Sequence, residues 1–238
     1  MNEVIQFLFK GKWSNERYGF VLNTKTVLIN YFKILFLYLI LVTLLAYFGL
    51  MESDKSPSLK GKGNEEIPMY FKLGFICLIG PIVEELVFRL PLKMSKVNSY
   101  VSTFFLYLFL FFVTKKQHPD INGLLKYSIC FLILFVSWGL IYLKYDRISA
   151  ILQKHFLIYF HLLTIAFCLV HYGNYNFNIK SVAPYLLMFL MLINGYYFAY
   201  TRLRFGFSYA VFIHIFHNTL ISIPLIIKWH IQLTKVTF

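Results

Sequence analysis

The chain has 238 residues, of which 59% are hydrophobic and only 14% are charged, and its mean hydropathy is +0.65. A soluble domain carries about a quarter charged residues, so this composition excludes an ordinary soluble protein and indicates an integral membrane protein. The net charge of +13 comes mostly from residues between apolar runs, which favours contact with anionic lipid head groups over nucleic-acid binding.

Long apolar runs predict the helices, since a helix needs about 20 apolar residues to cross a bilayer. Residues 1–26 are mixed and mildly basic and lack a secretory signal, so we expect a cytoplasmic N-terminal segment. A C-terminal tail is expected over residues 228–238. Between these ends we expect about seven membrane spans, near residues 27–50, 68–92, 99–114, 124–143, 156–173, 184–201 and 206–227.

These spans predict an all-α, polytopic transmembrane bundle. The runs are continuously apolar rather than alternating, which disfavours a β-barrel. The first span and the polar loop after it, residues 27–67, stand apart from the remaining spans in residues 68–227. The Lys and Arg bias of the short loops favours an N-terminus inside the cell and a multi-pass protein of the cell membrane.

Two adjacent acids, Glu84 and Glu85, lie inside the second apolar run, whereas the other acids lie in predicted loops or at the chain ends. An ionisable residue at this depth costs about 3 kcal/mol, so the pair needs a partner or a use. Arg89 follows Glu85 by one helical turn and can neutralise it. Glu84 projects about 100° away and lacks that counter-ion, which suits a general base. A purely structural ion pair would explain Glu85 and Arg89 but leaves Glu84 unexplained.

Histidines add to this polar set. His214 and Asn218 are four residues apart on the last span and share a face, where both can donate hydrogen bonds to one oxygen, as an oxyanion hole requires. His217 lies beside that face and is an alternative to His214. His171 ends the fifth span and can orient a water beside Glu84. We expect His161 to be a hydrogen-bonded packing residue.

Three motifs resemble those of one family. Residues 84–89, EELVFR, resemble its EExxxR motif; residues 167–171, FCLVH, match FxxxH; and residues 214–218, HIFHN, match HxxxN. The family is the CPBP or Abi family of intramembrane proteases, which contains CAAX prenyl endopeptidases and bacteriocin-processing enzymes. The resemblance covers roughly residues 70–222 and implies that residues 68–227 form a membrane domain enclosing a catalytic cavity. One departure is the stretch 196–200, which is bulkier than the small residues expected before the third motif.

The resemblance implies hydrolysis of a peptide bond by a glutamate-activated water. It assigns the base to Glu84 and the second motif carboxylate to Glu85, and it makes Arg89 the supporting arginine. His171 shares the water with Glu84. His214, preferred to His217 on this ground, and Asn218 stabilise the oxyanion.

The same Glu and His set can hold zinc, but we expect no cofactor and no metal, because the His and Asn pair serves better as an oxyanion hole. The expected partners are a peptide or small membrane-protein substrate and membrane lipid, without nucleic acid. Two other functions remain open: a non-catalytic membrane scaffold or bacteriocin self-immunity protein, and a proton or ion transporter that uses Glu84 and Glu85.

Overall fold

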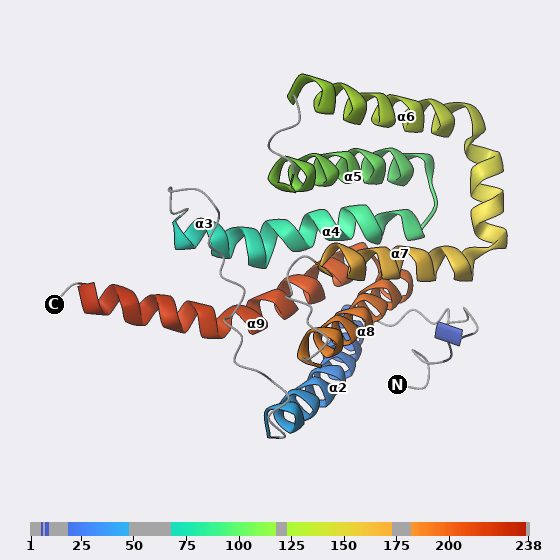
Figure 1. Cartoon of the computed structure of the whole chain (residues 1–238). Coiled ribbons are helices and arrows are strands. Elements are labelled where there is room, and N and C mark those ends of the chain that lie inside the picture. Colours follow the sequence, from blue (N-terminus) through green and yellow to red (C-terminus); the bar gives the residue numbers. More distant parts are fainter. Residues whose placement is uncertain are drawn as a thin grey trace.

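A computed structural model describes residues 6, 8–9, 19–47, 68–117, 123–172 and 182–236, and this part of the chain is helical, without a strand (Figure 1). The prediction of an all-α protein is confirmed to that extent. Among these described residues, four helices are long and apolar enough to cross a membrane: Phe20–Leu44, Tyr127–Lys154, Pro184–Arg204 and Phe207–Ile231. They indicate a membrane protein, while the full set of seven spans stays a prediction. The polar loop expected in residues 51–67 lies outside the described residues.

The helices follow most predicted spans, with different ends. They are α2 (Phe20–Tyr47), α5 (Lys96–Gln117), α6 (Gly123–Lys154), α7 (Phe156–Val170), α8 (Ala183–Arg204) and α9 (Phe207–Val236). Helix α2 begins at Phe20, seven residues before the first span expected from residue 27. The expected C-terminal tail from residue 228 is helical to Val236. Asp146, expected in a loop, lies inside α6.

The predicted second span, residues 68–92, is not one continuous helix. It consists of α3 (Met69–Gly74), a π-helical turn at Phe75–Ile79, α4 (Gly80–Phe88) and a 3-10 turn at Leu90–Leu92. Pro81 has no N–H to donate, and the Gly80 N–H bonds to the carbonyl of Phe75. A Cβ at position 80 would stand 3.0 Å from that same carbonyl oxygen, so glycine suits the widened turn.

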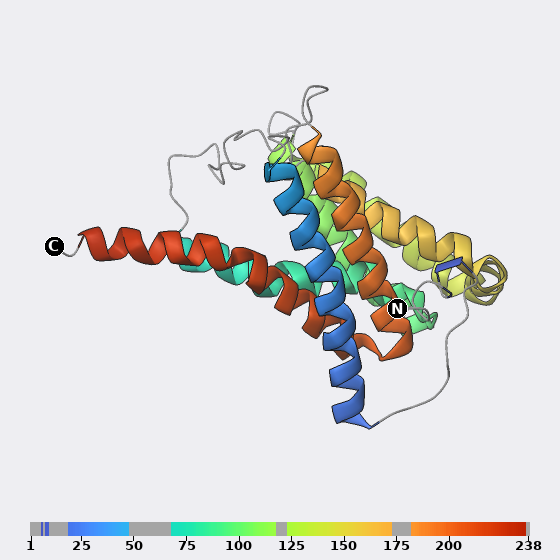
Figure 2. The same ribbon diagram turned by 90° about the horizontal axis from the view of Figure 1, so that it is seen from below.

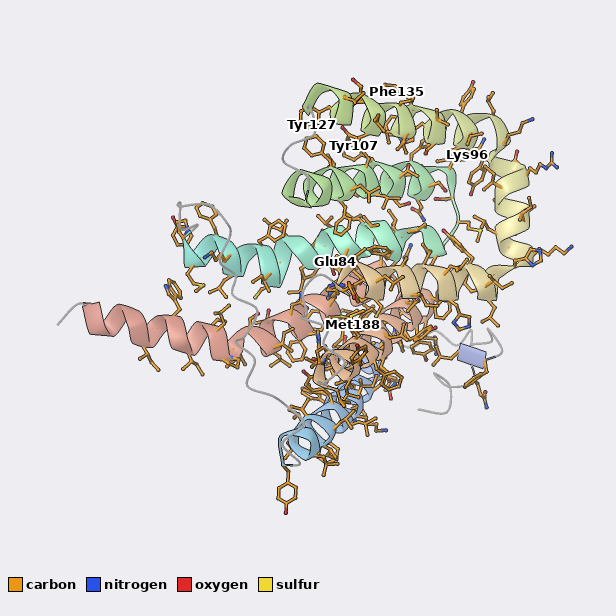
Figure 3. All side chains as sticks on the ribbon, viewed as in Figure 1. Glu84, Lys96, Tyr107, Tyr127, Phe135 and Met188 are labelled. Carbon is orange, nitrogen blue, oxygen red and sulfur yellow. The ribbon has the colours of Figure 1, made fainter. Side chains whose placement is uncertain are left out.

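The core lies where α2, α4, α7, α8 and α9 meet, and large buried rings fill it, among them Tyr31, Phe88, Phe167, Tyr197 and Phe198. Figure 2 shows α2 and α8 side by side, crossing the line of α9. On the other side of α4, helices α5 and α6 form a pair joined by aromatic contacts. Tyr107 and Tyr127, both labelled in Figure 3, belong to this contact. The polar side chains predicted for the site therefore meet on the α7, α8 and α9 side of α4.

Helix α6 is longer than a membrane is thick. Its 32 residues extend about 48 Å, against about 30 Å for the hydrocarbon core. Figure 1 shows that the last part of the helix, drawn in yellow, turns away from the first part and runs across the ends of α4 and α5 towards the start of α7. Figure 2 shows the same segment end-on, so both views place it transverse to its neighbours.

Candidate functional site

Two helices bring histidine side chains to Glu84. The carboxylate oxygens of Glu84 on α4 lie 3.7 Å from Nε2 of His171, at the end of α7, and 3.5 Å from Nε2 of His214 on α9. Figure 3 shows Glu84 on the side of α4 that faces α7 and α9. The three residues are 87 and 43 positions apart in sequence, and only the fold brings them together. Glu84 is therefore the common neighbour of two imidazoles.

Glu85 supports the same cluster from behind. Its Oε1 lies 2.9 Å from Nδ1 of His214, and its side chain is fully buried. A carboxylate accepts hydrogen bonds, so Nδ1 of His214 carries the proton, and Glu85 fixes both the tautomer and the direction of the ring. In the neutral ring, Nε2 then presents a lone pair towards Glu84. Glu85 thus acts on Glu84 through His214.

Arg89 is the buried cation of the site. Its Nε lies 3.7 Å from Oε1 of Glu85, and one of its terminal N–H groups donates to the carbonyl of Gly195 at 3.3 Å. The guanidinium carbon also stands 3.7 Å from the ring centre of Phe167, a cation–π contact. Position 195 is glycine because a Cβ there would come within 3.0 Å of the Phe167 ring. The predicted Glu85–Arg89 pair is therefore present, with Phe167 below the cation.

His171 is held by the helix that it ends. Its Nδ1 lies 2.9 Å from the carbonyl oxygen of Phe167 one turn earlier, so Nδ1–H donates and Nε2 is left as an acceptor towards Glu84. The rings of Phe167 and His171 are 4.9 Å apart. Two histidine lone pairs and one carboxylate thus converge with gaps of 3.5–3.7 Å, too long for direct hydrogen bonds. Such a set of acceptors attracts a donor, a water proton above all.

The members of the cluster differ in the exposed fraction of their side chains. Glu85 and Arg89 have 0% and 1% of their side-chain surface exposed and His214 has 3%, whereas Glu84 has 17% and His171 has 14%. A molecule that approaches from outside reaches Glu84 and His171 first. The accessible face of the cluster is therefore formed by these two residues, with the more deeply buried groups behind them.

The side chain of Asn218 bonds to the π-helical turn. Its side-chain amide donates to the carbonyl of Ile76 at 2.9 Å. The carbonyl of Ile76 lies in the π-helical turn, and the Gly80 N–H that an α-helix would direct to it bonds to Phe75 instead. Asn218 thus satisfies a backbone group freed by the Gly80–Pro81 pair. The second N–H of the amide remains for another acceptor.

His217 and His161 face other partners. His217 lies 2.9 Å from the hydroxyl of Tyr31 and 3.5 Å from the amide nitrogen of Asn194 in a separate buried polar group. His214, rather than His217, is the histidine of α9 that reaches Glu84. His161 bonds to the hydroxyl of Tyr196 at 2.9 Å, which confirms the expected packing role.

The aromatic walls of the site were not predicted from the sequence. Phe198 stacks on His214 with ring centres 4.5 Å apart, and Phe167 meets the same imidazole edge-on at 5.8 Å. The available signals were the first residue of FxxxH and the bulky stretch 196–200. In that stretch, Tyr197 and Tyr200 are buried in the core and Phe198 stacks on His214.

Zinc would use the side chains of Glu84, His171 and His214. In the part of the chain that the structure describes, no three His, Cys, Asp or Glu side chains are placed as ligands of one metal ion. The expectation of a metal-free site stays a prediction.

Comparisons with known proteins identify no family for this chain. No family model, no curated protein and no solved structure matches this chain significantly. The resemblance to intramembrane proteases therefore rests on the three motifs and on the geometry that brings them together.

Proposed function

We propose that the chain is an intramembrane endopeptidase of the CAAX protease and bacteriocin-processing type, working in the cell membrane with its N-terminus inside. One observation carries the proposal. Residues of three separate motifs, Glu84, His171 and His214, converge on one partly exposed carboxylate, while Glu85 and Arg89 support them from the buried side. A structural ion pair needs only Glu85 and Arg89 and gives no reason for two further imidazoles to face Glu84.

The proposed reaction begins with a water held by Glu84 and His171. Both present acceptors to it, so they bind its protons and direct its oxygen lone pair towards the peptide carbonyl. Glu84 takes one proton as the water oxygen attacks the carbonyl carbon. It then delivers that proton to the leaving nitrogen as the C–N bond breaks. Water exclusion by the surrounding helices strengthens each of these interactions.

The negative charge on the carbonyl oxygen needs donors. His214 can supply one from Nε2 if its ring takes a proton from solvent before the attack and returns it after the products leave, with Glu85 holding Nδ1–H throughout. Asn218 can supply the second through the N–H that Ile76 does not use. Removal of one such donor typically costs about 10²–10³ in kcat.

The test is cleavage by the purified full chain in detergent, incubated with a peptide library and single-span membrane-protein substrates and analysed for new peptide termini. Wild type is compared with Glu84→Gln, which keeps the side-chain size and removes the base. Loss of a general base is expected to lower the rate by about 10²–10⁴. Both proteins are also assayed with and without a chelator.

A matched pair of histidines on α7 provides the control. His171→Gln should abolish cleavage, whereas His161→Gln should retain it, since His161 contacts Tyr196 and not Glu84. Cleavage that survives Glu84→Gln would refute the proposal. Loss of cleavage on chelation would restore a zinc mechanism. Wild type without cleavage but with an immunity phenotype that survives Glu84→Gln would favour the scaffold, and proton flux in proteoliposomes would favour the transporter.

A further inference from the structure

The transverse end of α6 differs from the rest of that helix. Residues 144–154, here called the α6 end segment, follow the predicted span 124–143 and run across the neighbouring helix ends (Figures 1 and 2). An interfacial helix lies in the membrane plane with its Lys and Arg side chains at the level of the head groups. The transverse direction of the segment and its position after the predicted span suit such a placement.

Three exposed cations share one side of the segment, together with the exposed Ile151. Lys144, Arg147 and Lys154 are exposed and follow one another at spacings of three and seven residues, so they form one stripe on the helix. Tyr145 and Leu152 are half-buried on the opposite side. The single acid, Asp146, projects away from the stripe. With three cations and one acid, the segment carries a formal charge of +2.

Aromatic residues just before the α6 end segment indicate its depth in the membrane. Just before it, Tyr142 is 76% exposed, and Trp138 bonds through its ring N–H to Thr103 and packs on Tyr100. Trp and Tyr gather at the membrane–water interface because their rings are amphipathic. An aromatic layer followed directly by a cationic stripe is the order expected on passing from the acyl chains to the head groups.

Neighbouring helix ends add to the positive charge. Lys96 begins α5, and its ammonium stands 5.6 Å from the ring centre of Tyr145 in the segment. Figure 3 shows Lys96 beside the yellow end of α6. Lys93, just before α5, is exposed as well. This concentration of Lys and Arg at one end of the helices matches the cytoplasmic side of a membrane, whose leaflet carries anionic lipids.

We propose that the α6 end segment lies in the plane of the cytoplasmic membrane surface and binds the head groups of anionic phospholipids through Lys144, Arg147 and Lys154. Charge complementarity selects this partner, since each Lys or Arg near an anionic surface contributes to the attraction. The proposal does not depend on proteolytic activity.

The test uses Trp138 as a reporter in the full-length protein, reconstituted in bilayers. A variant with Trp13→Phe and Trp229→Phe leaves Trp138 as the single tryptophan. Quenching by brominated phosphatidylglycerol is compared with quenching by brominated phosphatidylcholine at equal mole fraction. We expect a preference for phosphatidylglycerol of at least about threefold at Trp138. A second variant that keeps only Trp229, near the distant end of α9, should show none.

Charge variants identify the source of the preference. In the Trp138 background, the combined change Lys144→Gln, Arg147→Gln and Lys154→Gln should reduce the ratio to about one, and 1 M salt should do the same to the unchanged segment. Asp146→Asn, which removes the acid and keeps the cations, should preserve or increase it. All four side chains are exposed, so these variants are expected to fold. Equal quenching by the two lipids in the unchanged segment, or a preference that survives the triple change, would overturn the proposal.

Discussion

Removal of Arg89 should destabilise the protein through Glu85. The Glu85 side chain is fully buried, and Arg89 is the cation beside it, at 3.7 Å on the next turn of the chain. Arg89→Met keeps the length of the side chain and leaves the carboxylate without that neutralising charge. Breaking a buried pair in this way costs about 3–5 kcal/mol.

The geometry of the pair indicates that the loss in the free energy of unfolding lies near the lower end of that range. The Glu85–Arg89 separation is that of an ion pair without a hydrogen bond, and Nε and Nη1 of Arg89 have no hydrogen-bond partner among the described residues. We therefore expect Arg89→Met to lower the free energy of unfolding by about 3 kcal/mol. The measurement is reversible unfolding in mixed micelles with increasing dodecyl sulfate, followed by tryptophan fluorescence.

A double-mutant cycle isolates the pair. Glu85→Gln removes the charge but keeps an oxygen that can accept from His214, so the double variant Glu85→Gln/Arg89→Met should be more stable than the sum of the single losses predicts, by more than about 1 kcal/mol. Lys93→Met, at an exposed lysine just after the 3-10 turn, is the control and should change stability by less than about 0.5 kcal/mol. Additive losses, or an Arg89→Met loss no larger than the control, would refute the reasoning.

Two further substitutions test the packing around the site. Gly195→Ala should destabilise by about 1–3 kcal/mol, because the new Cβ would stand 3.0 Å from the Phe167 ring, whereas Gly139→Ala on α6 meets nothing within 4 Å and should be neutral or stabilising by up to about 1 kcal/mol. Tyr31→Phe should cost about 1–3 kcal/mol because it removes the buried hydrogen bond to His217, and Tyr142→Phe, at an exposed position, should have little effect. The same micelle unfolding assay measures all four; similar values within either pair would contradict the packing argument.

The lengths of the apolar runs predicted the helices, but they did not predict where a helix is interrupted or changes direction. Continuous apolar runs specify helices in a membrane because no water is present to satisfy backbone groups. The same runs gave no signal for the transverse end of α6, because residues 144–154 remain helical after the span ends. The Gly80–Pro81 pair was visible in the sequence, but its effect on Ile76 and Asn218 depends on the approach of α9.

The sequence alone determined the class of molecule, its helical content and the list of groups able to do chemistry. The free-energy cost of burying charged groups supports that list. Glu84, Glu85 and Arg89 lie inside a hydrophobic run, and they persist there only if they have partners or a function. Only the tertiary structure decided which histidine of α9 reaches Glu84, which carboxylate is buried and which is partly exposed, and which rings enclose them. Those choices depend on how α4, α7 and α9 pack, and residue spacing along one helix constrains a face of that helix but not the neighbour that it meets.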